Sequence, residues 1–388
     1  MCSCTDGRAT MAKLRLDRAG GPKAVRDSNI ELYRILVMLM IIAHHYVVNS
    51  GLDTAGGPIY ADPLSAPSLF LLLFGAWGKM GLNCFVLITG YYMCTTQITA
   101  RKFAKIFLEI VFYRMVIAAA FWISGYTAFT WQSCLRIVFI FDSLTTSFFN
   151  CYLYYFLLIP FLNILLRHIS EKQLLRLLLL LFFMYVVLGT FKCFTITKNY
   201  VSWFAVLHLT AAYIRMYPKK LFANRRLWGI VTVGLLLAGW LTVVLCARDL
   251  KYAAFSYVRD SNTFLAYATA VSSFLFFKNL KLPYSRFINT AASSAFGVLC
   301  IHACGKMEPS WLWKDLLHVV DMYGTKQMYL HAVLSVLGIY VVCTVIDMAR
   351  IRWLEQPFFV WWDKRWPAFA RRFARWEERL CRRLHIGG

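Results

Sequence analysis

One apolar segment near the N-terminus carries the residues best suited to chemistry. Arg34 is followed by nine apolar residues and then by His44 and His45. Eleven helical residues turn through about 1100°, so His45 lies within about 20° of the direction of Arg34, whereas His44 is rotated from it by about 80°. The rise of a helix separates Arg34 from His45 by about 16 Å. We therefore predict that Arg34 and His45 share one face of a helix and line one cavity.

Two roles are open for this histidine pair. Histidine titrates near neutral pH and suits proton transfer, or it can carry a transferred group covalently. The alternative is a packing role, in which His44 and His45 only satisfy hydrogen bonds between helices. An arginine inside an apolar segment costs about 2.5–3.5 kcal/mol, so it faces protein or a water-filled interior. Arg34 on the same face therefore favours a functional role for His45.

A second apolar segment brings another histidine to a similar depth. His302 lies 15 residues beyond Phe287, which places it about 22 Å along a helix, at a level comparable with His45. A lone histidine is more often a packed residue than a ligand or a base. The depth of His302 leaves both a packing role and a site role open.

The composition indicates what holds these residues. The chain has 388 residues, of which 60% are hydrophobic and only 16% are charged. A soluble domain has about 45–50% apolar and about 25% charged residues. The formal charge is +23, but this charge does not form a basic face beside long apolar stretches, so a nucleic-acid partner is not expected. The composition predicts an all-α, polytopic bundle of transmembrane helices.

The charges between the apolar segments predict how the chain is oriented. Of the 42 Lys and Arg residues, 29 fall in the two tails and in alternate connections, nine in the other connections and four within spans. Positive residues concentrate on the cytoplasmic side, so we expect about ten spans with both termini in the cytoplasm. The expected spans are 30–50, 68–93, 103–124, 147–166, 173–191, 200–217, 227–246, 262–280, 287–304 and 329–349.

The two ends of the chain differ from the apolar part between them. We expect a basic cytoplasmic tail over residues 1–26, a membrane domain over 27–358 and a basic amphipathic tail over 359–388. In the last tail, aromatic residues recur at three- and four-residue steps between arginines, which predicts a helix in the lipid headgroup region. A helix that docks a partner is the alternative. Cys2 and Cys4 are too few for a zinc site, and no metal is expected.

Several motifs in order along the chain carry a family resemblance. The most specific is Arg34, ten residues and His45, and looser matches are Gly81, Phe85, Thr89, Gly90 and Tyr91, then Tyr154 to Asn163, then Gly297, Ile301 and His302. In these motifs, from about Asn29 to Phe358, the chain resembles the integral-membrane acyltransferase-3 family, which includes bacterial O-antigen acetylases. One departure is that Lys102 and Lys105, with Arg101 adjacent, replace an Arg-x-x-Arg motif. Lysine keeps the charge of arginine but not its bidentate geometry.

The resemblance implies an O-acyltransferase of the bacterial cytoplasmic membrane. Such an enzyme moves an acyl group, usually acetyl, from cytoplasmic acyl-CoA to a carbohydrate hydroxyl at or beyond the outer face. His45, Arg34 and His302 are then the expected catalytic residues, and Arg101, Lys102 and Lys105 are expected to bind the phosphates of the acyl-CoA. We favour His45 as a general base over a covalent acyl-histidine. The expected partners are membrane lipid, the carbohydrate acceptor and acyl-CoA.

Two other classes of membrane protein share parts of this pattern. A transporter of a lipid-linked sugar or small anion would also have broken spans and interior charges, but the two halves of the chain show no symmetry. A glycan polymerase or ligase would be expected to place larger polar loops outside the membrane. Acyl transfer is the preferred prediction, and a transporter is the first alternative.

Overall fold

The computed structural model describes residues 26–54, 56–138, 147–191, 193–194, 199–249, 254–303, 305 and 310–383. Cys2, Cys4 and nearly all of the predicted N-terminal tail lie outside the described residues. Within those residues every regular element is a helix. The elements are α2 (Ser28–Val48), α3 (Pro58–Ala61), α4 (Ala66–Gly75), α5 (Gly78–Met93), α6 (Ala100–Ile123), α7 (Trp131–Val138), α8 (Phe148–His168), α9 (Glu171–Leu181), η1 (Phe182–Val187), α10 (Leu188–Thr190), α11 (Tyr200–Met216), η2 (Lys220–Ala223), α12 (Arg225–Asp249), α13 (Phe264–Lys278), α14 (Arg286–Ser293), α15 (Ala295–Ala303), η3 (Trp311–Leu316), α17 (Met328–Arg350), η4 (Ile351–Glu355) and α18 (Gln356–Arg383).

The prediction of an all-helical membrane bundle is confirmed. In the described part of the chain, seven helices are long and apolar enough to cross a membrane. The expected spans 200–217, 262–280 and 287–304 correspond instead to the shorter helices α11, α13 and the pair α14 and α15. A straight crossing needs about 20 apolar residues, so helix length alone does not assign crossings to these three segments.

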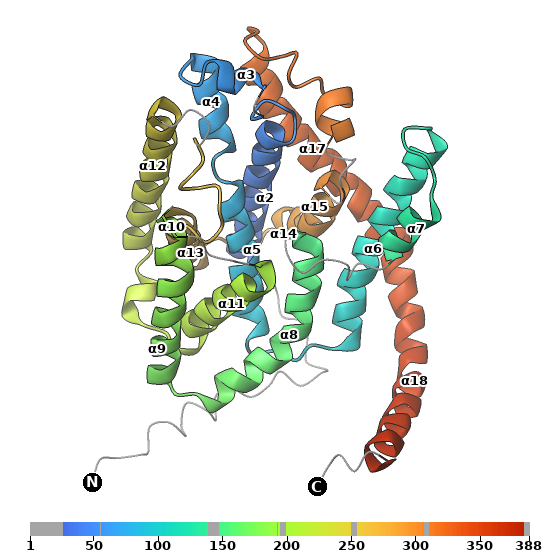
Figure 1. Ribbon diagram of the computed structural model, residues 1–388. Helices are drawn as coiled ribbons and strands as arrows, with labels where there is room; N and C mark the ends of the chain where they lie inside the picture. The colour runs from blue at the N-terminus through green and yellow to red at the C-terminus, as the bar shows by residue number, and fades with distance from the viewer. Residues whose placement is uncertain are drawn as a thin grey trace, which may run out of the picture.

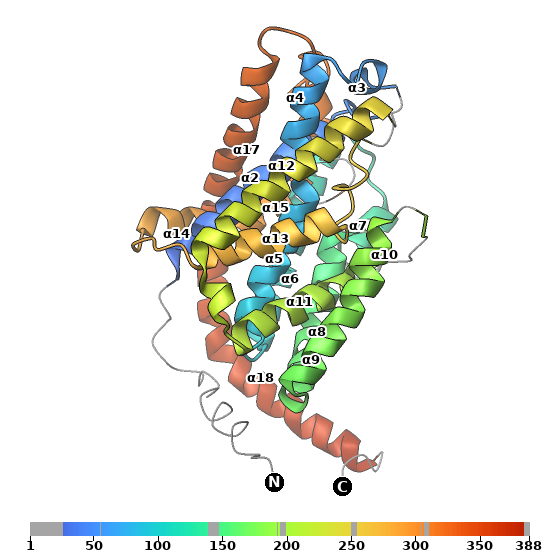
Figure 2. The ribbon, with the colours of Figure 1, turned by 90° about the vertical axis from the view of Figure 1, so that its left-hand side faces the viewer.

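Helices α2 and α5 form the centre of the bundle. Helix α2 packs against α4, α5, α13, α14, α15 and α17, and α5 packs against α11 and α13 as well. Helices α9 and α12 lie on one side of this centre and α6 on the other (Figure 1). Seen from the side, α11 and α13 run obliquely across the interior (Figure 2). The centre is apolar, because α2 places Val37, Met38 and Ile42 in fully buried positions.

The C-terminal part is one long helix with a π-helical segment in it. Helix α17 continues through η4 into α18, which extends beyond the start of α6 (Figure 1). The helix runs without a break through the expected domain boundary at residue 358. Two ion pairs join it to the start of α6: Arg101 with Asp363 at 3.0 Å and Lys105 with Glu355 at 2.6 Å. The row of exposed aromatic residues on α18 includes Phe369, Phe373 and Trp376, and its contact with lipid headgroups stays a prediction.

A buried ion network holds α6 against the junction of α17 and η4. Arg350, only 8% exposed, pairs with Asp347 at 2.8 Å, Glu355 at 3.0 Å and Glu109 at 3.1 Å. Tyr113 donates a hydrogen bond to Asp347 at 2.7 Å. The guanidinium of Arg350 therefore connects carboxylates from three helical segments.

This network also determines how the charged residues of α6 are paired. Glu109 and Arg114 lie five residues apart on α6, but they do not pair with each other. In the structure Glu109 pairs with Arg350 from the far end of the chain. Arg114 instead donates a hydrogen bond to the amide oxygen of Asn150 at 3.1 Å. Five residues of helix place two side chains on different faces, so Glu109 and Arg114 point away from each other. Glu109 therefore pairs with Arg350, which tertiary packing brings close to it.

The connection between α2 and α3 contains a carboxyl group whose ionisation we expect to destabilise the fold. Burial raises the pKa of Asp53 to about 6, and the nearby Arg259 opposes part of this shift. A folded pKa above the unfolded value means that stability is complete below the unfolded pKa and is lost as the pH rises through about 6. We expect Asp53→Asn to raise the stability at pH 7.5 by on the order of 2 kcal/mol, and to raise it less as the pH falls toward about 4. Thermal unfolding of the detergent-solubilised protein at several pH values checks this. A variant no more stable than wild type at pH 7.5 would contradict it.

Candidate active site

A break in the second expected span brings it close to α2. Helix α4 ends at Gly75 and α5 begins at Gly78. A Cβ at Gly78 would lie 2.2 Å from the Cβ of His44, and one at Gly75 would lie 2.8 Å from a methyl group of Val47. Only glycine allows so close an approach. The glycines around Lys79 therefore mark a broken helix at a cavity.

The break also explains His44. The Nδ1 atom of His44 lies 2.7 Å from the carbonyl oxygen of Gly75, at the end of α4 where carbonyl groups lack helical partners. The side chain is 6% exposed. His44 thus satisfies the end of α4, and the packing role that was open for the histidine pair belongs to this residue.

His45 makes a different contact. Its Nδ1 atom lies 3.1 Å from the Nε2 atom of His302, and the two ring centroids are 5.2 Å apart. His45 lies in the last turn of α2 and His302 in the last turn of α15. The similar depth of the two histidines, expected from the sequence, is therefore a direct side-chain contact between residues 257 positions apart.

The hydrogen bonds around this pair fix its proton positions. The Nδ1 atom of His302 lies 2.6 Å from the carbonyl oxygen of Val298. Because a carbonyl can only accept, His302 carries its proton on Nδ1, and its Nε2 atom accepts the proton that His45 donates from Nδ1. The Nε2 atom of neutral His45 is then left with a free lone pair. This is the tautomer that a general base requires.

Of the pair, only His45 lines the described cavity. His302 is 1% exposed and has no place in the cavity lining, whereas His45 lines a cavity of about 600 Å³. That volume is in the range of pockets that hold a small ligand. The geometry makes His45 the group that can touch a reacting molecule, and it makes His302 a residue that positions His45.

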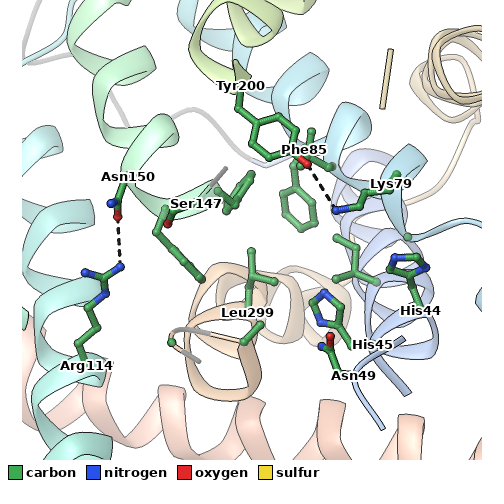
Figure 3. Close-up of a pocket in the computed structure, with 17 residues that line it drawn as sticks. His44, His45, Asn49, Lys79, Phe85, Arg114, Ser147, Asn150, Tyr200 and Leu299 are labelled. Atoms are coloured by element: carbon green, nitrogen blue, oxygen red, sulfur yellow. Dashed lines mark hydrogen bonds between the residues drawn. The ribbon is translucent and has the colours of Figure 1, made fainter. Parts of the chain in front are cut away.

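Two cations also line this cavity. Lys79, near the start of α5, lies with its ammonium group 3.4 Å from the hydroxyl of Tyr200, and Arg114 reaches Asn150. Figure 3 shows Lys79 beside the two histidines and Arg114 at the opposite wall. Neither cation was assigned to the site from the sequence. The signal that could have found them is a charged residue within an expected span that has no carboxylate at helical spacing.

Arg34 is not brought into this cavity. It pairs with Glu31 at 3.5 Å, and the described lining reaches only Ile41 along α2. Val37 and Met38, both fully buried, occupy the turns between Ile41 and Arg34. Arg34 and His45 thus lie on one helix, but the described cavity reaches only His45.

The three cations expected to bind donor phosphates lie at the start of α6. Arg101 pairs with Asp363 and stacks over the ring of Phe359 at 4.8 Å. Lys102 donates to the carbonyl of Gln97 at 3.0 Å, and Lys105 pairs with Glu355. None of the three lines the cavity that contains His45. The C-terminal helix therefore occupies two of the three expected phosphate ligands.

In the described residues, no cluster of three or more histidine, cysteine or acidic side chains could hold a metal ion. The site therefore consists of imidazole, ammonium, guanidinium and amide groups around a cavity in a helical membrane bundle. These groups suit proton transfer and the binding of negative charge.

The fold is that of a multi-pass membrane protein, and the cavity beside His45 is its candidate reaction centre. Residues 27–348 match the family model described as an acyltransferase domain, which covers most of the chain. The protein belongs to this acyltransferase-3 family. No curated protein and no solved structure matches the chain.

Proposed function

We propose that the protein is an O-acyltransferase of the bacterial cytoplasmic membrane. It transfers an acyl group, preferentially acetyl, from cytoplasmic acyl-CoA to a hydroxyl group of a cell-surface glycan or its precursor. The observation that carries this proposal is the contact between His45 and His302 at the edge of a cavity, in a chain of the acyltransferase-3 family. The family makes acyl transfer the reaction, and the pair supplies the base that a hydroxyl acceptor needs.

The proposed reaction uses the free lone pair of His45. The acceptor hydroxyl gives its proton to Nε2 of His45 while its oxygen attacks the thioester carbonyl carbon. The carbon–sulfur bond breaks, and the imidazolium returns the proton to the departing thiolate of CoA. His302 accepts the hydrogen bond from Nδ1–H throughout, and so holds the ring and disperses the charge that forms on it.

The C-terminal ends of α2 and α15 stabilise the imidazolium form of His45 that arises during the proposed reaction. Both His45 and His302 lie in the last turns of their helices. The C-terminal end of a helix carries partial negative charge, which stabilises a nearby imidazolium by about 0.3–1 kcal/mol at exposed positions. A proton on His45 in the middle of the reaction is therefore supported from α2 and from α15.

The donor is proposed to approach from the end of the bundle where α6 begins. Arg101 is half exposed and its partner Asp363 is also half exposed, so their ion pair is weak and a phosphate group can compete for it. Lys102 lies beside Arg101. Lys105 pairs with Glu355, which is only 10% exposed, and anchors the C-terminal helix more firmly. Arg34 lies on α2 between this end and the cavity, where it is proposed to guide the thioester arm.

We expect substitutions of the two residues in this ion pair to change the KM for acetyl-CoA in opposite directions. We expect Arg101→Gln to raise the KM for acetyl-CoA several-fold, because a phosphate ligand is lost. We expect Asp363→Asn to lower the same KM by up to about twofold, because a competing surface carboxylate is removed. Initial rates at varied acetyl-CoA concentration measure both. If both substitutions raised KM equally, the ion pair would hold the structure rather than compete with the donor.

A transfer assay separates the proposal from its first alternative. Purified protein in nanodiscs is supplied with acetyl-labelled acetyl-CoA and a panel of glycosides, and the label is followed into alkali-labile esters. Ester formation that requires the protein supports O-acyl transfer. Glycoside movement across proteoliposomes without any need for acyl-CoA would favour a transporter.

A further inference from the structure

The cavity beside His45 has an excess of positive charge. Its described lining includes Lys79 and Arg114 but no aspartate or glutamate. The partner of Lys79 is the hydroxyl of Tyr200, and the partner of Arg114 is the amide of Asn150. Both partners are neutral, so they satisfy hydrogen bonds without cancelling charge.

Other cations in this bundle have carboxylate partners. Arg350 forms ion pairs with three carboxylates, and Arg34 forms one with Glu31. Arg114 lies on the same helix as Glu109, but Glu109 forms its ion pair with Arg350. A charge at membrane depth without a counter-charge is costly. The cost at Lys79 and Arg114 is offset when a ligand brings the negative charge.

Three helix starts add to the positive charge of this cavity. The cavity is lined by Gly78 and Lys79 at the start of α5, by residues 148–150 at the start of α8 and by Tyr200 at the start of α11. The helices have 16, 21 and 17 residues. Helices α5 and α8 have no side-chain hydrogen bond at their N-caps. Free N–H groups and the positive ends of helix dipoles favour anions.

The two cations lie at different walls of the cavity. Lys79, at the start of α5, lies beside the histidines, whereas Arg114 of α6 lies across the cavity with Asn150 of α8. Figure 3 shows His45 with Asn49 and Leu299 on one side of the cavity, and Tyr200, Ser147 and Asn150 on the other. A molecule bound in the cavity would place its reacting hydroxyl at His45 and a negative group at Lys79 or at Arg114.

We propose that this cavity binds an anionic substrate group, a carboxylate or a phosphate, and that Lys79 and Arg114 supply the counter-charge. The inference rests on the proposed transfer site and names its substrate class. The group belongs either to an acidic sugar of the acceptor or to the phosphates of the donor. Each source provides the same chemistry, an oxyanion that accepts charge-assisted hydrogen bonds from an ammonium or a guanidinium.

Binding measurements test the proposal without turnover. Full-length protein in nanodiscs is titrated by calorimetry with methyl glucuronide, with neutral methyl glucoside and with coenzyme A. We expect Lys79→Gln and Arg114→Gln each to weaken an anionic probe by about tenfold, which corresponds to about 1.4 kcal/mol, and to change methyl glucoside binding less than twofold. Lys79→Arg should keep most of the affinity. Lys326→Gln, an exposed cation in the outer connection, is the matched control.

Measurements of KM then determine whether the acceptor or the donor carries the anionic group. If the acceptor carries it, the variants raise KM for the glucuronide and leave KM for acetyl-CoA unchanged. If the donor carries it, they raise KM for acetyl-CoA but not for S-acetyl-N-acetylcysteamine, which has no phosphate. Unchanged binding of every anionic probe would overturn the proposal, as would an equal loss of kcat with charged and neutral acceptors. A protein that binds glucuronide through Lys79 but acylates no acceptor would overturn the transfer function and leave this inference standing.

Discussion

Replacement of His45 by alanine is expected to lower kcat for acyl transfer by about 10²–10⁴-fold. That is the usual contribution of a general acid–base group, and the free Nε2 lone pair of His45 is the base that the hydrogen bonds leave available. The measurement is the initial rate at saturating acetyl-CoA and acceptor. A His45→Ala rate within threefold of wild type would contradict the role of this residue.

His302 provides a graded companion to this experiment. In His302→Gln an amide oxygen can still accept the hydrogen bond from Nδ1–H of His45, whereas His302→Leu removes the acceptor and leaves a buried donor unsatisfied. We therefore expect the glutamine variant to keep much more activity than the leucine variant. The pH profile of kcat should also shift in the leucine variant, because the ring that His302 supports has lost its partner. Equal activities in the two variants, with unshifted pH profiles, would mean that His302 only fills space.

Loss of Arg350 is expected to have the largest effect on stability. Arg350→Met removes the guanidinium that pairs with Asp347, Glu355 and Glu109, and leaves buried carboxylates without their counter-charge. Breaking such a buried pair costs about 3–5 kcal/mol. Thermal unfolding in detergent should show a clear drop in Tm, and cross-links between α6 and the C-terminal helix should become inefficient.

A control for this variant lies two residues further along the chain. Arg352 is exposed, and its only hydrogen bond in the described structure is a long one, at 3.4 Å, to Gln356. Arg352→Met should therefore change Tm by no more than a surface substitution does. Equal losses in the two variants would show that the region responds to total charge and not to the buried network.

The helical membrane architecture could be predicted because it depends on composition. The apolar stretches, the glycines around Lys79 and the depth of His302 are local properties of the sequence, and each has its counterpart in the structure. The length of a crossing was less predictable. Helix α11 has 17 residues and α13 has 15, because oblique helices inside a bundle need not match the thickness of a membrane.

The composition of the site could be predicted only in part. Helix geometry gives the direction of Arg34 and His45 on α2, but it does not say whether one cavity reaches both, and the described cavity extends along α2 only to Ile41. Pairing was also beyond the local pattern, since Glu109 finds Arg350 and leaves Arg114 to the cavity. The cations at the start of α6 looked free because their partners, Asp363 and Glu355, come from the C-terminal helix.

The central claim is that a group enters as an acyl thioester on one side of the membrane and leaves as an ester on the other, through a cavity served by His45. Sealed proteoliposomes with a membrane-impermeant glycoside trapped inside, and labelled acetyl-CoA added only outside, measure this directly. For molecules inserted with the start of α6 facing outward, the account predicts labelled ester in the lumen with wild-type protein and none with His45→Ala. Lumenal ester formed equally by both proteins, or ester formed only on glycoside added outside, would contradict it.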